Sequence, residues 1–222
     1  MFKLKQTLLA SFVVLTMVCA SAPIYSQQRG AQRLTPPDGD VAFELIGQVT
    51  NIPSTPNSIQ YGYLSTINGL SADQIFTTAV PTAQNQTTSL FTFYTEAATS
   101  RAIGNDGLNT INRTGTTTIY FDATPDGDFV NPDSFRDGTP VLVMTLRQQV
   151  IVDTTERTFT VVNVNTVTSA DDFPLGAESF RLGKKRDQFR TSLIGRLNAV
   201  GAPPPTGFFA GHAIAIERLE RD

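Results

Sequence analysis

The segment from Thr139 to Thr168 constrains the fold more than any other part of the chain. Two long runs rich in Val, Leu, Ile, Phe and Thr flank a short polar break at 153–157, and such runs around a turn cluster are typical of a β-hairpin. A helix is disfavoured, because the apolar positions do not recur at intervals of three and four. In the first run the apolar residues occupy alternate positions, which predicts one buried face. These residues are Leu142, Met144, Leu146, Val150 and Val152.

The rest of the chain repeats this pattern of short apolar runs separated by turn residues. Further strands are expected at 41–50, 58–67, 89–97, 115–123, 178–182, 187–197 and 208–217. The pair 178–182 and 187–197 is expected to form a second hairpin around 183–186, residues 98–114 are expected to be a loop, and 71–74 resembles a helix start. Eight to ten strands of this kind predict an all-β fold, an antiparallel barrel or sandwich, with a slight preference for the barrel.

The N-terminus predicts export. Two lysines precede an apolar stretch, Leu8 to Cys19, that is too short to span a bilayer, and small residues follow it; this is the pattern of a secretory signal peptide. The expected organisation is a signal peptide at 1–22, a flexible linker at 23–39 and a single β domain at 40–222, in a secreted or periplasmic protein. Lipidation of Cys19 is a rival reading, but Thr16 and Val18 do not fit that signal.

Charge and hydropathy limit the partners. Removing the two lysines of the signal leaves 15 of the 17 basic residues against 20 acidic ones, a net charge of −5 for the mature chain. Bulk attraction to nucleic acid or to an anionic membrane is therefore not expected. No transmembrane segment is expected in the mature chain, because no later stretch is long and apolar enough.

Aromatic residues on the expected strands are candidates for a ligand cavity. A barrel of about eight strands can hold one small ligand or be filled by its own side chains. Tyr61, Tyr63, Phe91 and Phe93 are the candidates, and His212, the only histidine, joins them if its strand face points inward. Core packing is the ordinary use of such residues.

Acidic residues between the fourth and fifth expected strands are candidates for a metal site. Asp122, Asp126 and Asp128 offer the carboxylate oxygens that Ca²⁺ prefers, but Asp and Gly also serve tight turns. Calcium is the one cofactor considered. Hydrolase or isomerase chemistry would require His212 with carboxylates, and no serine elbow motif accompanies that histidine.

A basic turn is the last candidate. Lys184, Lys185 and Arg186 lie between two expected strands in a chain that is acidic elsewhere, so they are candidates for contact with an acidic surface. A solvated turn is the simpler reading of these three residues.

These features together predict an exported, non-catalytic binding protein that holds a small apolar or amphipathic ligand in a β-barrel. Two alternatives stay open. One is a structural or adhesive envelope protein that contacts acidic surfaces, and the other is a hydrolase or isomerase that depends on carboxylates and His212. The oligomeric state is open.

Overall fold

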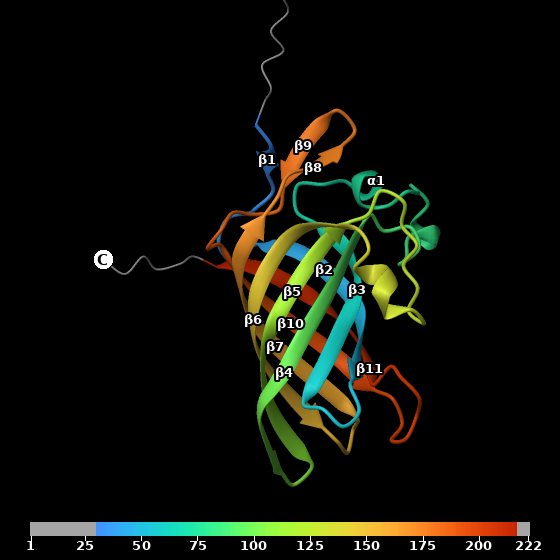
Figure 1. Ribbon diagram of the computed structural model, residues 1–222, viewed down its shortest axis with the longest axis vertical. Coiled ribbons are helices and arrows are strands. Elements are labelled where there is room, and N and C mark those ends of the chain that lie inside the picture. Colours follow the sequence, from blue (N-terminus) through green and yellow to red (C-terminus); the bar gives the residue numbers. More distant parts are fainter. Residues whose placement is uncertain (1–29, 217–222) are drawn as a thin grey trace, which may run out of the picture.

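The computed structural model describes residues 30–216, and these form a closed eight-stranded antiparallel β-barrel (Figure 1). The strands follow one another around the barrel in chain order, and β11 pairs back with β2 to close it. The all-β prediction is confirmed, and the structure decides for the barrel over the sandwich. The barrel strands are β2 (Val41–Asn51), β3 (Asn57–Ile67), β4 (Phe91–Asn105), β5 (Leu108–Phe121), β6 (Thr139–Asp153), β7 (Thr158–Ala170), β10 (Gln188–Leu197) and β11 (Gly207–Ile216).

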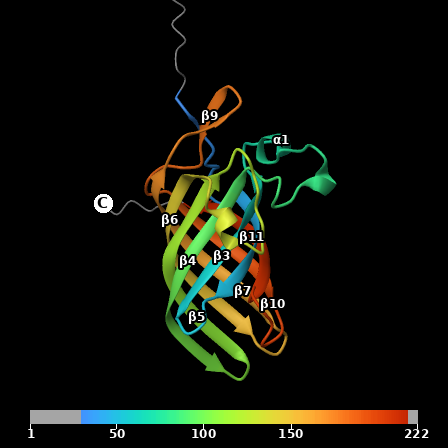
Figure 2. The ribbon, with the colours of Figure 1, turned by 45° about the vertical axis from the view of Figure 1, so that its right-hand side comes forward.

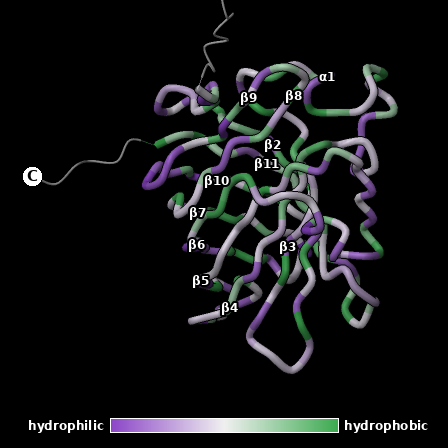
Figure 3. The backbone as a smooth tube through the Cα atoms, turned by 45° about the horizontal axis from the view of Figure 1, so that its top comes forward, coloured by the Kyte–Doolittle hydropathy of each residue, from purple (hydrophilic) through white to green (hydrophobic). Residues whose placement is uncertain are grey.

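The central hairpin forms as the sequence predicts. Strands β6 and β7 pair along their length and are joined at 154–157, where the Asp153 carboxylate accepts hydrogen bonds from the backbone N–H groups of Thr155 and Glu156, both at 2.9 Å. Of the alternating apolar residues of β6, Val152 is half-buried and the other four are buried, whereas Arg147 and Gln149 are exposed on the outer wall. Hydrophobic and hydrophilic residues follow one another along the barrel strands (Figure 3).

The two ends of the barrel differ. At one end, which we call the open end, neighbouring strands are joined directly by hairpin connections, and no further element of residues 30–216 lies over the lumen. At the other end, which we call the covered end, longer segments carry short elements over the barrel (Figures 1 and 2). The short elements are β1 (Gln32–Arg33), α1 (Ala72–Ile75), β8 (Phe173–Leu175), β9 (Glu178–Arg181) and the 3₁₀ turns η1 (Pro81–Ala83) and η2 (Pro132–Phe135). Strands β1, β9 and β8 form a separate three-stranded sheet.

Aromatic packing fills the covered end. Phe173 of β8 lies 5.2 Å from Phe91 and 5.6 Å from Phe121 between ring centroids, and Phe180 of β9 lies 6.2 Å from it. Phe91, Phe173 and Phe180 are buried in the main hydrophobic core. The burial of this much aromatic surface stabilises the end of the barrel and closes it.

The predicted hairpin between 178–182 and 187–197 is wrong. Strand β9 pairs with β8 and β1, whereas β10 pairs with β7 and β11 inside the barrel wall. The chain leaves the barrel after β7 to form the outer sheet and returns at β10, so the turn at 183–186 joins two different sheets.

The predicted loop at 98–114 is also wrong, because β4 and β5 continue through it as one long hairpin. Asp106 and Gly107 make its turn, both with positive φ (46° and 83°), as a two-residue type I′ hairpin turn requires. Asn and Gly in this stretch suggested a loop, but they belong to the exposed tip of a hairpin, where little burial is needed.

Part of the stretch expected to be a flexible linker, within residues 30–39, has defined structure. Strand β1 pairs with β9, Leu34 is buried, and Arg33 forms a salt bridge of 2.6 Å with Asp187. The helix start expected at 71–74 is present as α1, whose Ser71 and Gln74 make a capping box. The predicted signal peptide, with Cys19, lies outside the described residues.

Candidate functional site

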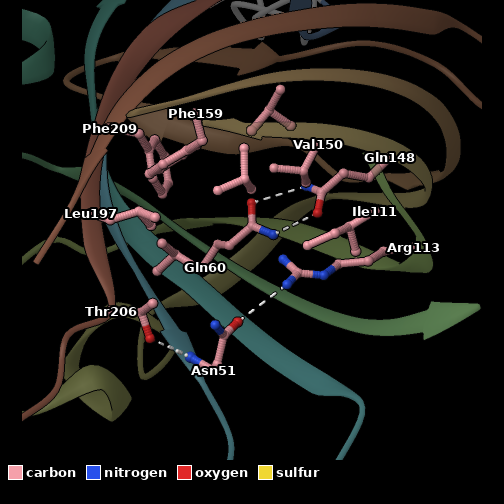
Figure 4. Close-up of a pocket in the computed structure, with 13 residues that line it drawn as sticks. Asn51, Gln60, Ile111, Arg113, Gln148, Val150, Phe159, Leu197, Thr206 and Phe209 are labelled. Carbon is pink, nitrogen blue, oxygen red and sulfur yellow. Dashed lines mark hydrogen bonds between the residues drawn. The ribbon is translucent and has the colours of Figure 1, made fainter. Parts of the chain in front are cut away.

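The barrel interior contains a cavity of about 160 Å³ near the open end (Figure 4), which we call the open-end cavity. Its lining comes from β2, β3, β5, β6, β7, β10 and β11 and from the connection before β11, so it lies across the barrel lumen. Eight lining residues are apolar: Val49, Ile111, Val150, Val152, Phe159, Val161, Leu197 and Phe209. Five are polar: Asn51, Gln60, Arg113, Gln148 and Thr206.

A pair of glutamines crosses the lumen at the inner side of this cavity. Gln60 of β3 and Gln148 of β6 exchange two hydrogen bonds of 3.2 Å, each amide donating to the oxygen of the other (Figure 4). Both side chains are buried, at 5% and 4% exposure, so each amide provides the hydrogen-bond partner that water cannot provide there. Gln60 also lines a smaller inner cavity of about 30 Å³ deeper in the barrel.

Arg113 carries the only charge among the lining residues. Its Nε donates to Thr99 Oγ1 at 3.3 Å and its Nη2 donates to Asn51 Oδ1 at 3.2 Å. The side chain is buried at 9% exposure, and burial lowers the pKa of the guanidinium from its ordinary value. A guanidinium nonetheless stays protonated in proteins, so the cavity holds a permanent positive charge.

A belt of further polar residues surrounds the inner cavity. Asn165 Nδ2 donates to Thr191 Oγ1 at 2.9 Å, and the hydroxyls of Thr95 and Thr117 lie 2.9 Å apart. The buried amide oxygens of Asn163 and Asn165 have no hydrogen-bond partner among residues 30–216. The middle of the lumen is therefore polar, and the open-end cavity beside it combines apolar walls with Arg113, Asn51 and Thr206.

Tyr61 and Tyr63 do not line either cavity. They alternate along β3 with Gln60, which points into the lumen, so they lie on the outer wall. Tyr61 packs against Phe135 of η2, with ring centroids 5.5 Å apart, and its hydroxyl donates to Gln48 Oε1 at 3.3 Å. Tyr63 packs edge-on against Phe76, and burial raises the pKa of its phenol. The connections that hold α1 and η2 bury both tyrosines from outside.

The other three candidates for the ligand cavity are split between the barrel interior and its outer wall. Phe93 lines the inner cavity, and Phe91 belongs to the aromatic packing of the covered end. His212 is exposed on the outer wall, because its neighbour Ala213 takes the buried face of β11. The thirteen lining residues of the open-end cavity, all within the described part of the chain, include no histidine and no carboxylate.

The acidic residues gather differently from the prediction. Carboxylate oxygens of Asp122, Asp126 and Asp137 lie within 4.8 Å of one another, whereas Asp128 turns away and accepts a hydrogen bond from the Val130 N–H at 2.9 Å. Partial burial and the two neighbouring acids raise the pKa of Asp137. Calcium binding at this cluster stays a prediction.

The basic turn is exposed at the covered end. Lys184, Lys185 and Arg186 all face solvent, and the adjacent Asp187 is engaged by Arg33 and by the backbone N–H of Lys184 at 2.9 Å. The three side chains do not contribute to either cavity.

The polar residues of the lumen have a recognisable sequence pattern, because they lie in register with the buried face of a strand. Gln148 occupies the position between Leu146 and Val150 on the buried face of β6, and a polar residue in register with a buried face indicates an interior polar contact. Arg113 shows the same pattern, because it shares its face of β5 with Ile111 and Ile119. Neither residue was selected from the sequence.

Comparisons with known proteins give no further guide. No protein-family model matches the chain, no curated protein matches its sequence and no solved structure matches its fold. Among residues 30–216, no helix is long and apolar enough to cross a membrane.

Proposed function

We propose that this chain is an exported binding protein that holds a small amphipathic ligand in the open-end cavity. The observation that carries the proposal is the cavity itself, which combines eight apolar lining residues with a few polar groups. That composition is typical of small-molecule sites, where apolar walls supply affinity and a few polar groups fix orientation. The expected signal peptide supports export.

The volume limits the ligand to a small molecule. An engineered cavity of 150 Å³ lined by apolar side chains binds benzene, and the open-end cavity has about the same volume. One ring or a short alkyl chain therefore fits, and a larger ligand would extend through the open end.

A non-catalytic role is supported by the chemistry of the lining. General acid–base catalysis would require a group such as a carboxylate or a histidine within reach of the ligand, and the cavity offers amides, one hydroxyl and one guanidinium. His212, on which the alternative of a hydrolase or isomerase depended, lies on the outer wall.

Native mass spectrometry tests the proposal. The mature chain, residues 23–222, would be exported by a bacterial host and weighed before and after denaturation, and we expect a co-purifying small mass that denaturation removes. The same measurement on Val161→Phe, which fills the cavity, should show that mass lost. Val164→Phe is the matched control, because Val164 lies on the outer face of the same strand, β7.

Two outcomes would contradict this function. One is a clean mass for the wild-type protein that also stays unchanged after incubation with hydrophobic small molecules. The other is a bound mass that survives Val161→Phe in a variant whose circular dichroism shows a folded barrel.

A further inference from the structure

Arg113 is a buried cation without an acidic partner. None of the salt bridges formed by residues 30–216 involves it. Its two hydrogen bonds go to the neutral oxygens of Thr99 and Asn51. A buried charge normally has an opposite charge beside it, because its desolvation is otherwise uncompensated.

The guanidinium also has donors to spare. It carries five N–H groups, and Nη1 makes no hydrogen bond within the described residues. Figure 4 shows the side chain reaching into the cavity from β5, across from Phe159 and Phe209. A ligand in the cavity would therefore meet a positive, hydrogen-bonding group at one side and aromatic rings at the other.

The electrostatics of the cavity favour a monoanion. Arg113 supplies one positive charge, and the other polar lining residues, Asn51, Gln60, Gln148 and Thr206, are neutral. A carboxylate matches the planar fork of a guanidinium and accepts two parallel hydrogen bonds from it. A phosphate monoester would bring up to two negative charges to a single cation.

We propose that Arg113 binds the carboxylate of a small amphipathic acid whose ring or short alkyl chain occupies the apolar part of the open-end cavity. This inference rests on the proposed function and specifies the class of its ligand. Arg113 donates hydrogen bonds to Thr99 and Asn51, and the carboxylate would supply the negative charge that these neutral oxygens lack.

Matched ligands test the head group. Isothermal titration would compare 3-phenylpropionate with 3-phenylpropan-1-ol, and hexanoate with hexan-1-ol, on the mature protein at pH 7. Because each pair shares its apolar part, we expect each acid to bind at least about tenfold more tightly than its alcohol, which is the fold-change of one well-placed charged hydrogen bond. Hexyl phosphate is included as the alternative anion.

Variants assign the effect to Arg113. Arg113→Gln should remove the preference for the acid and leave alcohol binding within about twofold. Arg190→Gln is the matched control, because Arg190 is exposed on the outer wall and should leave both affinities unchanged. Urea unfolding of each variant checks that the barrel is intact.

The outcomes separate this inference from the function on which it rests. Equal affinity for acid and alcohol, or a preference that survives Arg113→Gln, overturns the role of Arg113 and leaves a neutral ligand in the cavity. Tighter binding of hexyl phosphate than of hexanoate overturns the carboxylate in favour of a phosphate. Failure of every ligand to bind the folded wild-type protein refutes both proposals.

Discussion

The glutamine pair inside the barrel provides a quantitative test of the structure. Replacing Gln60 or Gln148 by Met keeps the length of the side chain and removes its amide. Each single replacement breaks two hydrogen bonds of 3.2 Å and leaves the partner amide buried, at 4% or 5% exposure, with neither donor nor acceptor satisfied. An unsatisfied buried polar group costs about 1–3 kcal/mol, so each single variant should lose about 2 kcal/mol of unfolding free energy.

The double variant should lose much less than the sum of the two single losses. With both amides gone, no polar group is left unpaired, and two thioether side chains fill the same space. Because replacing both partners of a buried hydrogen bond by apolar groups of similar shape is close to neutral, we expect the double variant to lie within about 1 kcal/mol of wild type. The coupling free energy of the pair is then about 3–4 kcal/mol, at or slightly above the upper end of the range for residues in contact.

Urea unfolding followed by circular dichroism at pH 7 measures these values. The slope of free energy against urea should be unchanged, so that shifts of the midpoint report stability. Gln149→Met on the exposed face of β6 is the matched control and should stay within about 0.5 kcal/mol of wild type. If the double variant instead loses the sum of the two single losses of unfolding free energy, to within about 0.5 kcal/mol, the two amides do not interact and the reciprocal pair is refuted.

Three further replacements test other parts of the fold. Phe173→Ala removes the ring that is 1% exposed over the covered end; it should cost about 3–5 kcal/mol in urea unfolding and leave ligand affinity at the open end unchanged. Gly195→Ala would place a Cβ against the Phe159 ring, so overpacking should lower the free energy of unfolding by about 1–3 kcal/mol. The displaced ring should move towards the cavity and weaken ligand binding in titrations. Asp137→Asn should raise stability at pH 7 by a few tenths of a kcal/mol, a small effect because solvent screens this exposed carboxyl. The folded pKa of Asp137 is raised above its ordinary 3.8, so the stability that its protonated form contributes is fully present below pH 3.8 and is lost as pH rises through the folded pKa. The stability advantage of Asp137→Asn should therefore disappear near pH 3. Thermal unfolding measured across pH checks this.

The period of the apolar residues predicted the barrel strands because burial enforces that period. In β6, buried and exposed residues alternate without a break from Met144 to Ile151, because the inward residues contact the barrel interior. The β4–β5 extension lacks this constraint, because its residues from Ala98 to Asn105 are mostly exposed, and the hairpin depends on turn chemistry at Asp106–Gly107. The partner of β9 could not be predicted, because four residues contain too little pattern to distinguish a barrel strand from an outer sheet.

The site was harder to predict because strand periodicity identifies two faces without saying which one is inside. His212 was a candidate on the condition that its strand face points inward, but it shares the outer face of β11 with Phe208 and Ala210. Tyr61 and Tyr63 were candidates for the cavity as aromatic residues on an expected strand, but the η2 and α1 connections bury them on the outer wall. Which face of a strand points into the lumen is decided by contacts between strands that are distant in sequence, such as the Gln60–Gln148 pair between β3 and β6.

The covered end of the barrel contributes stability, whereas the open end holds the proposed binding site. At the covered end, Phe91, Phe121, Phe173 and Phe180 pack ring against ring, so this end of the barrel is held by apolar contacts that do not depend on a ligand. This allows the open end to retain a cavity and an unpaired guanidinium, both of which lower the stability of the empty protein. A ligand that fills the cavity and neutralises Arg113 would offset both costs, and it would stabilise the folded state by an amount that grows with the logarithm of its concentration above Kd. The features that weaken the empty barrel are therefore the same ones that select its ligand.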